Sequence, residues 1–286
     1  MSGKIATLVS QILEENLNEH FLGMTAISEG DSQQVFKVSA NNGNYVAKFF
    51  SQVPNFERER NFLEIGLPIT PKLIGCRDCC IVMEYINSPM LGRKTLTEED
   101  LLKQLLLAFN DFHRESKIVQ LRQWIEVLDF SETIRSLASS CHLNAEQTRV
   151  VDQLVGQATE LDNLPSINTL CHGDFNQYNV FSDSGRFKII DFESLTVAPR
   201  LYDLMMLLSI NQFSVDHIAI ALAFFENNKH NPITKDEYSQ AQQYFHVATG
   251  INGLWYLAKY QESGSQEFGI KANYFLDQLT FLIDNY

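Results

Sequence analysis

Residues 170–181 read Leu-Cys-His-Gly-Asp-Phe-Asn-Gln-Tyr-Asn-Val-Phe, and residues 187–193 read Phe-Lys-Ile-Ile-Asp-Phe-Glu. Apolar residues flank the polar positions in both stretches, which is typical of short strands on either side of a polar loop. Asp174, Asn179 or Asp191 taken alone would be interpreted as a turn or strand-end residue. The joint pattern instead indicates a functional hairpin.

This pattern, His-Gly-Asp-x-x-x-x-Asn followed by Ile-Ile-Asp-Phe-Glu, resembles the catalytic loop and metal loop of the aminoglycoside phosphotransferase and choline kinase superfamily. The resemblance implies a protein-kinase-like fold and phosphoryl transfer from ATP, which needs positioning and charge neutralisation more than covalent help. It implies that Asp174 orients the substrate hydroxyl, and that Asn179 and Asp191 hold Mg²⁺ with Glu193 as a further ligand. We expect His172 to support the loop, because the family pattern gives the acid–base role to the aspartate.

Lys48 stands in Asn44–Phe50, which reads Asn-Tyr-Val-Ala-Lys-Phe-Phe. A lysine in a strand is usually an edge or solvent residue, but Val-Ala-Lys before a helix resembles the phosphate-binding lysine of kinases. Such a lysine needs an acidic partner from the next helix. We expect Glu59 to be that partner, with Glu57 as a close alternative.

Two further segments resemble nucleotide-binding parts of the same fold. Gly30 and Ser32 lie between the first two expected strands, where a loop would cover the phosphates, although a plain hairpin fits this segment equally well. The apolar run Ile81–Ile86 resembles the hinge strand that offers backbone groups to adenine. We therefore expect Glu84 and Ile86 at the nucleotide.

The acceptor side resembles choline and ethanolamine kinases in part. Gly-Leu-Trp at 253–255 and Glu-Phe-Gly at 267–269 match segments that build an aromatic pocket for an ammonium group, a design in which cation–π attraction binds the substrate. Trp255, Tyr256 and Asp174 are thus the expected substrate residues. The match is incomplete, because Asn252 replaces a second Trp and Ile270 and Asn273 replace later aromatic residues.

The identity of the acceptor stays open at this point. Tyr256, Tyr260 and Tyr274 either complete the aromatic pocket or belong to the core. Related enzymes phosphorylate choline, ethanolamine, aminoglycosides, homoserine, thiamine and sugar-like substrates, and a fold does not select among them.

Asp203 resembles the family aspartate that braces the catalytic loop, although an acid at a helix start would look the same.

The distribution of short strands and helices predicts an α+β, bilobal protein-kinase-like fold. A helix is expected over residues 4–19, and strands over 24–28, 34–39, 45–50 and 80–85, with a hairpin signal at 40–44. Helical pattern covers 55–65, the segment after Thr97, 119–162 and 202–286. We expect a nucleotide-binding lobe over 1–86 and a helical lobe over 87–286 that carries the catalytic loop and the substrate pocket.

Composition restricts the partners. The formal charge of −13 argues against nucleic acid as a main partner, and no apolar run approaches the roughly 18 residues that span a bilayer. The five cysteines are too few for a disulfide scaffold, and Cys76, Cys79 and Cys80 suggest a short reduced turn. We expect a cytoplasmic enzyme that uses ATP, Mg²⁺ and a small alcohol, with the oligomeric state open.

The sequence also argues against two other classes of protein. A kinase fold used as an inactive binding module would lose Lys48, Asp174, Asn179 or Asp191, and all four are present. A protein kinase is disfavoured because no Ala-Pro-Glu segment follows Asp191.

Overall fold

The computed structural model describes residues 2–28, 33–118, 125–165, 167–183, 185–226 and 235–286. The chain forms two compact units, one of residues 1–125 and 177–195 and the other of residues 126–176 and 196–286. Strands dominate the first part of the chain and helices the second, so the predicted α+β class is confirmed. The division into lobes at residue 86 concerns function and stays a prediction.

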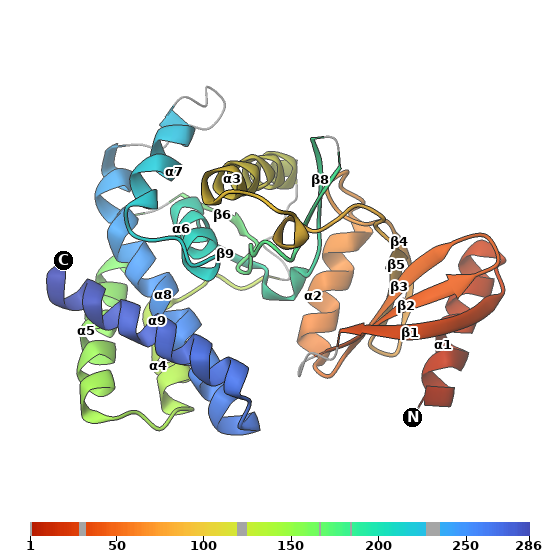
Figure 1. Ribbon diagram of the computed structural model, residues 1–286, viewed down its shortest axis with the longest axis horizontal. Helices are drawn as coiled ribbons and strands as arrows, with labels where there is room; N and C mark the ends of the chain where they lie inside the picture. Colours follow the sequence, from red (N-terminus) through yellow and green to blue (C-terminus); the bar gives the residue numbers. More distant parts are fainter. Residues whose placement is uncertain (1, 29–32, 119–124, 166, 184, 227–234) are drawn as a thin grey trace. The chain divides into compact units, whose positions relative to one another are not determined.

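The first unit is built on an antiparallel sheet of five strands in the order β1-β2-β3-β5-β4 (Figure 1). Its strands are β1 (Phe21–Ser28), β2 (Gln33–Ala40), β3 (Asn44–Phe50), β4 (Leu73–Arg77) and β5 (Cys80–Glu84). The expected hairpin joins β2 to β3, and the N–H of Ala40 donates to the carbonyl of Gly43 at 2.9 Å.

Strand β4 was not predicted. Asp78 and Cys79, both with positive φ (48° and 59°), form the two-residue turn that joins it to β5, as a primed hairpin turn requires. The described cysteines are all free thiols.

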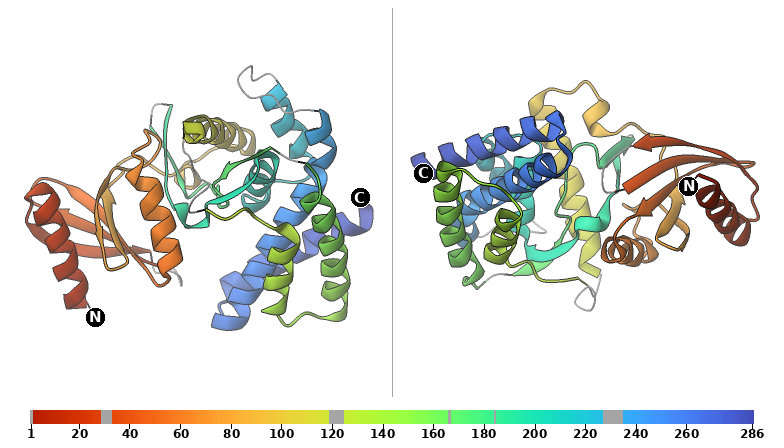
Figure 2. Two further views of the ribbon diagram at one scale, coloured as in Figure 1. Left: turned by 180° about the vertical axis from the view of Figure 1, so that it is seen from behind. Right: turned by 90° about the horizontal axis from the view of Figure 1, so that it is seen from below.

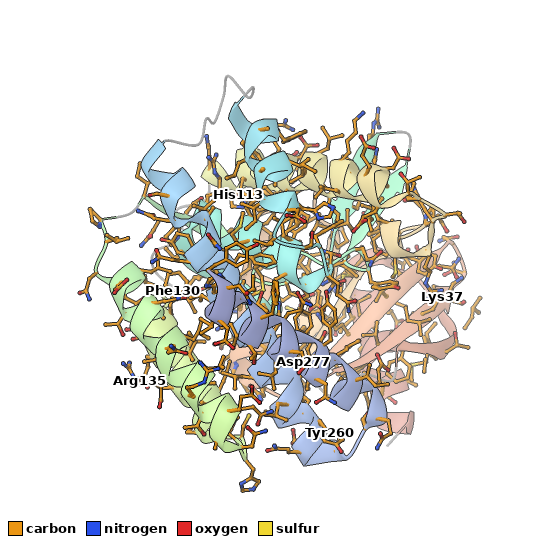
Figure 3. All side chains as sticks on the ribbon, turned by 60° about the vertical axis from the view of Figure 1, so that its left-hand side comes forward. Lys37, His113, Phe130, Arg135, Tyr260 and Asp277 are labelled. Atoms are coloured by element: carbon orange, nitrogen blue, oxygen red, sulfur yellow. The ribbon has the colours of Figure 1, made fainter. Side chains whose placement is uncertain are left out.

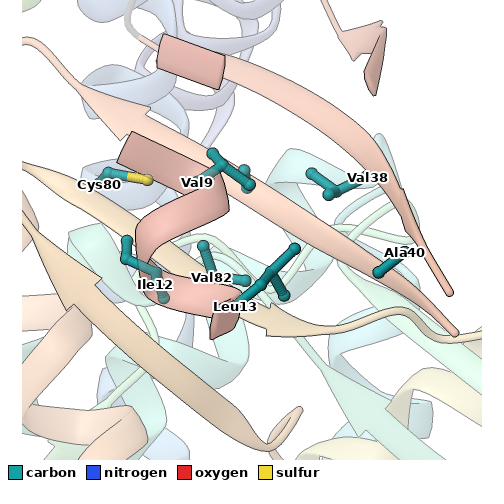
Figure 4. Packing of buried hydrophobic residues seen from close by; sticks show 8 residues of the cluster. Val9, Ile12, Leu13, Val38, Ala40, Cys80 and Val82 are labelled. Atoms are coloured by element: carbon teal, nitrogen blue, oxygen red, sulfur yellow. The ribbon is translucent and has the colours of Figure 1, made fainter. Parts of the chain in front are cut away.

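Helix α1 (Ser2–Leu17) packs on one face of this sheet (Figure 4). The buried cluster there consists of Val9, Ile12, Leu13, Val38, Ala40, Ala47, Cys80 and Val82. Successive residues of a strand point to opposite faces, so Lys48 points away from α1 when Ala47 points toward it. Helix α2 (Val53–Glu64) lies on the side of Lys48, where Phe56 meets Phe50 with ring centroids 5.9 Å apart.

The remaining elements of the first unit are helix α3, a two-stranded hairpin and short 3₁₀ turns. Helix α3 (Glu98–Glu115) begins after Thr97, whose side chain accepts the N–H of Asp100 at 3.1 Å, as a helix cap does. The hairpin of β7 (Val180–Asp183) and β8 (Arg186–Ile189) follows the catalytic loop. Short 3₁₀ turns complete the unit: η1 (Leu91–Arg93), η2 (Ser116–Ile118) and η4 (Phe192–Ser194).

The second unit is mainly helical (Figure 2). Its helices are α4 (Phe130–Ser139), α5 (Ala145–Asp162), α6 (Arg200–Ile210), α7 (His217–Glu226), α8 (Lys235–Ser263) and α9 (Gln266–Asn285). Strands β6 (Asn168–Cys171) and β9 (Thr196–Pro199) pair antiparallel. Helices α8 and α9 pack along each other, and Figure 3 marks Tyr260 and Asp277 on them.

The helical stretch expected over 119–162 is wrong in its extent. Residues 119–124 lie outside the described residues, and residues 125–129 are not helical. Asp129 caps α4 by accepting the N–H of Glu132 at 2.8 Å, and Asn144 and Gln147 form a capping box that starts α5. Caps compete with helix continuation and so divide the stretch.

No helix in the described part of the chain is long and apolar enough to cross a membrane.

Candidate active site

Lys48 is buried between two carboxylates. Its Nζ lies 2.5 Å from Oε2 of Glu59 and 2.7 Å from Oδ1 of Asp191. Burial alone would lower the pKa of Lys48, but Asp191, Glu59 and Glu193 together raise it above its ordinary value. The lysine therefore keeps its charge. Glu59 is the helix partner, because its side chain is buried against Lys48 while Glu57 is exposed.

The pKa of Glu59 is also raised, but by burial rather than by its charged neighbours alone. Burial raises the pKa of its carboxyl to about 7, although Lys48 opposes the change. Asp191 and Glu193 add negative charge to the same place. The cluster thus holds more carboxylate than one ammonium group neutralises, which favours the arrival of a further cation.

The β7–β8 hairpin brings Asn179 and Asp191 to the same end. Val180 pairs with Ile189, so the residues just outside this pair flank the open end of the hairpin. The N–H of Ile190 donates to the carbonyl of Asn179 at 3.0 Å and closes that end. Asp191 has φ 70° and ψ 66°, in the left-handed backbone region that residues other than glycine rarely adopt. Neighbouring contacts must hold such a residue in place.

Helix α2 makes these contacts through Phe62, Asn55 and Arg58. Phe192 is buried with its ring 4.6 Å from that of Phe62. Asn55 Nδ2 lies 3.3 Å from Oε2 of Glu193, and Arg58 Nη1 donates to the carbonyl of Glu193. The sequence analysis did not predict Asn55 or Arg58. Asn55 lies three residues before Arg58 and four before Glu59, so the helical period was the available signal.

The donor set fits magnesium. Asn179, Asp191 and Glu193 offer amide and carboxylate oxygens, which hard cations prefer. Burial and the charge of Asp191 raise the pKa of Glu193. Among the described residues no group of three or more His, Cys, Asp and Glu side chains is arranged as a metal site. Magnesium usually takes one or two carboxylates from the protein and the rest of its coordination from phosphates and water.

The loop of residues 172–179 follows β6 and begins in the second unit. Asp203 is fully buried, and its two oxygens accept the N–H groups of His172 at 3.1 Å and Gly173 at 3.0 Å. Gly173 has φ 77°, which suits glycine. The N–H of Asp174 lies 3.3 Å from Nδ1 of His172, so this ring nitrogen is an acceptor. The expected bracing by Asp203 is confirmed, and His172 supports the loop.

Asp174 is also held by an amide that the sequence analysis missed. Asn176 Nδ2 donates to Oδ1 of Asp174 at 2.9 Å, and Asn211 Nδ2 donates to the carbonyl of Phe175 at 3.0 Å. Asn176 occupies an unspecified position of the motif, and a polar amide two residues after the aspartate was the available signal. Asp174 lies in the second unit, whereas Asn179 and Asp191 lie in the first.

Comparison with known proteins identifies the family. Residues 23–230 match the model of the phosphotransferase enzyme family. The chain belongs to this family. It is therefore a small-molecule phosphotransferase whose acceptor is an alcohol group. No curated protein matches the sequence.

Solved structures of this phosphotransferase's fold include choline kinases. Choline kinase LicA from Streptococcus pneumoniae is 18% identical, with a TM-score of 0.78 over 99% of this chain and 100% of that chain; LicA has also been solved with AMP. A choline/ethanolamine kinase family protein from Mesorhizobium loti is 16% identical, with a TM-score of 0.75 over 99% and 95%. Spectinomycin phosphotransferase, solved with ADP and spectinomycin, is 15% identical, with a TM-score of 0.63 over 98% of each chain. These likenesses confirm the predicted protein-kinase-like fold.

The aromatic residues expected at the acceptor of this phosphotransferase lie on α8 and α9. Trp255 is 41% exposed, and its ring centroid lies 5.0 Å from that of Tyr256. Burial, with Asp174 and Glu267 adding negative charge, raises the pKa of Tyr256 to about 12. The charge of Asp174 therefore reaches the phenol of Tyr256 within the second unit.

Tyr256 is nevertheless largely committed to packing. Its ring stacks on Phe275, with centroids 5.6 Å apart and planes 3° from parallel. Lys271 Nζ already lies over the same ring, 5.3 Å from its centroid, and pairs with Glu267 at 2.8 Å. Tyr260 packs with Tyr256 against Leu257, Ala272 and Leu276.

The other predicted nucleotide residues are less informative. Gly30 and Ser32 lie outside the described residues. Glu84 ends β5, its N–H donates to the carbonyl of Lys72 at 2.9 Å, and its carboxylate lies 3.6 Å from Lys188 Nζ. Ile86 follows the strand and is half-buried. Its side chain and that of Glu84 make no contact with Lys48 that the structure describes.

Proposed function

We propose that the chain transfers the γ-phosphoryl group of ATP, bound with Mg²⁺, to a hydroxyl of a small amine-bearing molecule of the choline or ethanolamine type. The observation that carries the proposal is Lys48, buried and charged between Glu59 and Asp191. Burying an ammonium group is costly unless it is paired, and the two carboxylates keep Lys48 charged, as binding of phosphate requires. The nucleotides bound to LicA and to spectinomycin phosphotransferase support this choice.

Each residue has a separate task. Lys48 neutralises the α- and β-phosphates, and Glu59 holds its ammonium group in position. Asn179, Asp191 and Glu193 would hold Mg²⁺, which supplies charge neutralisation on the transferring phosphoryl group. Asp174, fixed by Asn176, accepts the hydrogen bond of the substrate hydroxyl and turns its oxygen toward phosphorus.

The remaining nucleotide contacts are assigned by fold. The segment with Gly30 and Ser32 would cover the phosphates through backbone N–H groups. Glu84 and Ile86 would meet adenine through backbone groups other than the N–H of Glu84, which Lys72 already engages. We assign residues 1–86 to the nucleotide lobe and 87–286 to the acceptor lobe, and we place the enzyme in the cytoplasm, where ATP is supplied.

An amine is favoured in the acceptor because Trp255 presents an exposed aromatic surface and the chain carries a charge of −13. A cation gains from both. Aminoglycosides form the second candidate class, since Lys271 over Tyr256 leaves less aromatic surface for a quaternary ammonium group. Homoserine, thiamine and sugar-like alcohols belong to the same test.

The test is release of ADP from Mg²⁺–ATP with choline, ethanolamine, several aminoglycosides, homoserine, thiamine and a ribose analogue. Asp174→Asn is the control, since it keeps the shape of the side chain and removes the carboxylate. We expect turnover with one amine-bearing alcohol, lowered by about two to four orders of magnitude in the control. Equal turnover in wild type and control would refute the role of Asp174. Absence of nucleotide binding would instead support an inactive binding module.

A further inference from the structure

Helix α2 presents one face to the Lys48 cluster. Asn55, Arg58, Glu59 and Phe62 follow the spacing i, i+3, i+4 and i+7, which places them on one side of a helix. Each makes a contact with Lys48 or with the segment Asp191–Glu193. A helix that met the cluster through the Lys48–Glu59 pair alone would not need the other three residues on this face.

The contacts of Arg58 and Asn55 converge on one residue. Arg58 donates to the backbone carbonyl of Glu193, and Asn55 donates to its carboxylate with a separation of 3.3 Å. The carbonyl fixes the course of the backbone directly after the left-handed residue Asp191, and the amide fixes the side chain. The two together determine the conformation of Glu193 more tightly than either contact does.

We propose that Asn55 and Arg58 are positioning residues that hold the segment Asp191–Glu193 in its Mg²⁺-binding conformation. This inference rests on the proposed magnesium role of Asp191 and Glu193. Because the same helix carries Glu59, the lysine that meets the phosphates and the carboxylates that meet the ion are fixed by one rigid element. Displacing α2 therefore weakens both interactions at once.

The strained backbone explains why such positioning is needed. A residue other than glycine in the left-handed region is strained, and it persists only when its surroundings fix it. Phe192, buried against Phe62, anchors the segment through apolar contact. Apolar packing has little directionality, whereas the hydrogen bonds of Arg58 and Asn55 set the orientation of the oxygen donors.

The experiment measures binding of N-methylanthraniloyl-ADP to the full-length protein by fluorescence, first without divalent metal and then during titration with Mg²⁺. The variants are Arg58→Met, Arg58→Lys and Asn55→Ala. Arg60→Met is the matched control, because Arg60 lies on the same helix but pairs with Glu64 at 3.7 Å, outside the cluster. Thermal unfolding of each metal-free protein checks that α2 is retained.

We expect Arg58→Met to raise the Mg²⁺ concentration for half-maximal binding by roughly 10- to 100-fold, as is usual for residues behind metal ligands. Metal-free binding should stay unchanged, because Lys48 and Glu59 remain paired. Arg58→Lys should retain part of the wild-type affinity for Mg²⁺. The double variant Arg58→Met/Asn55→Ala should lose less Mg²⁺ affinity than the sum of the two single variants, since both residues act through Glu193.

Equal weakening of metal-free and Mg²⁺-dependent binding would overturn the inference, because it would mean that Arg58 merely stabilises α2. Unchanged binding in Arg58→Met would overturn it as well. If nucleotide binding by the wild-type protein is indifferent to Mg²⁺, the proposed magnesium site itself fails and the inference fails with it. A control Arg60→Met that matches Arg58→Met would show a loss without specificity for the cluster and would also refute the positioning role.

Discussion

Replacing Asp203 by asparagine should separate loop bracing from nucleotide binding. The carboxylate accepts two backbone N–H groups, those of His172 at 3.1 Å and Gly173 at 3.0 Å, in a fully buried position. Asparagine has nearly the same shape, but one of its oxygens becomes an NH₂ group, which is a donor. One of the two loop N–H groups therefore loses its acceptor and faces another donor.

The magnitude follows from these two hydrogen bonds. A hydrogen bond to a charged group contributes about 1.5–3 kcal/mol, and one of the two is lost. If this free energy holds the loop in its productive conformation, turnover falls by roughly 10- to 150-fold. Affinity for Mg²⁺–ATP should stay close to that of wild type, since Lys48 and Asp191 belong to the first unit.

The assay combines ADP release, with the best acceptor of the panel, and urea unfolding. Ser209→Ala is the control, because Ser209 lies on the same helix and hydrogen-bonds Thr249 at 3.2 Å and Asn252 at 3.1 Å without touching the loop. This control should lose stability but keep its turnover number. If Asp203→Asn loses stability and retains full turnover, the bracing of the loop has no role in catalysis and the reasoning is refuted.

Two further predictions concern the second unit. Burial lowers the pKa of His246 from 6.5 to about 4. As pH falls, the imidazole is therefore protonated in the unfolded chain before it is protonated in the folded protein. Stability due to His246 is therefore complete above pH 6.5 and decreases by up to about 3 kcal/mol toward pH 4. Urea unfolding at several pH values should show a smaller decrease in His246→Gln than in wild type or in the exposed control His142→Gln; parallel curves would contradict this. Trp255→Leu should raise KM for an amine acceptor while KM for ATP stays constant, and an equal rise in both constants would remove Trp255 from the acceptor site.

The Lys48–Glu59 pair and the hairpin after Asn179 could be predicted from the sequence because their geometry is local. Asn179 and Asp191 flank a hairpin of two short strands, so the strand pattern places them at the same end of that hairpin. The direction of Lys48 follows from strand alternation next to Ala47. The choice between Glu57 and Glu59 was left open, yet the helical period decides it: Glu59 shares a face with Phe56 and Phe62, which are buried.

Other features depend on contacts that are distant in sequence. Strand β4 contains Gly75, a poor strand former, and this lowers its strand signal. The reason for the glycine lies in α1, because a Cβ at position 75 would come within 2.7 Å of Asn16 Nδ2 and 2.9 Å of Ile12 Cγ2. Similarly, the break between α4 and its preceding segment depends on Asp162, which accepts the N–H groups of Phe130 and Ser131 at 2.9 Å from the far end of α5.

The departures from the choline kinase pattern near the acceptor also have a structural cause. Asn252, where that family often has a second Trp, is buried and donates to Ser209 on α6 at 3.1 Å. A Trp at this position would have to enter the packed interface of α6 and α8, so Asn252→Trp would overpack the helices rather than add an aromatic face. In the proposed acceptor site, the exposed ring of Trp255 and the carboxylate of Asp174 would then supply the contacts to an amine. An enzyme built in this way is expected to select a compact amine by charge and one aromatic contact, and to distinguish poorly between primary and quaternary ammonium groups.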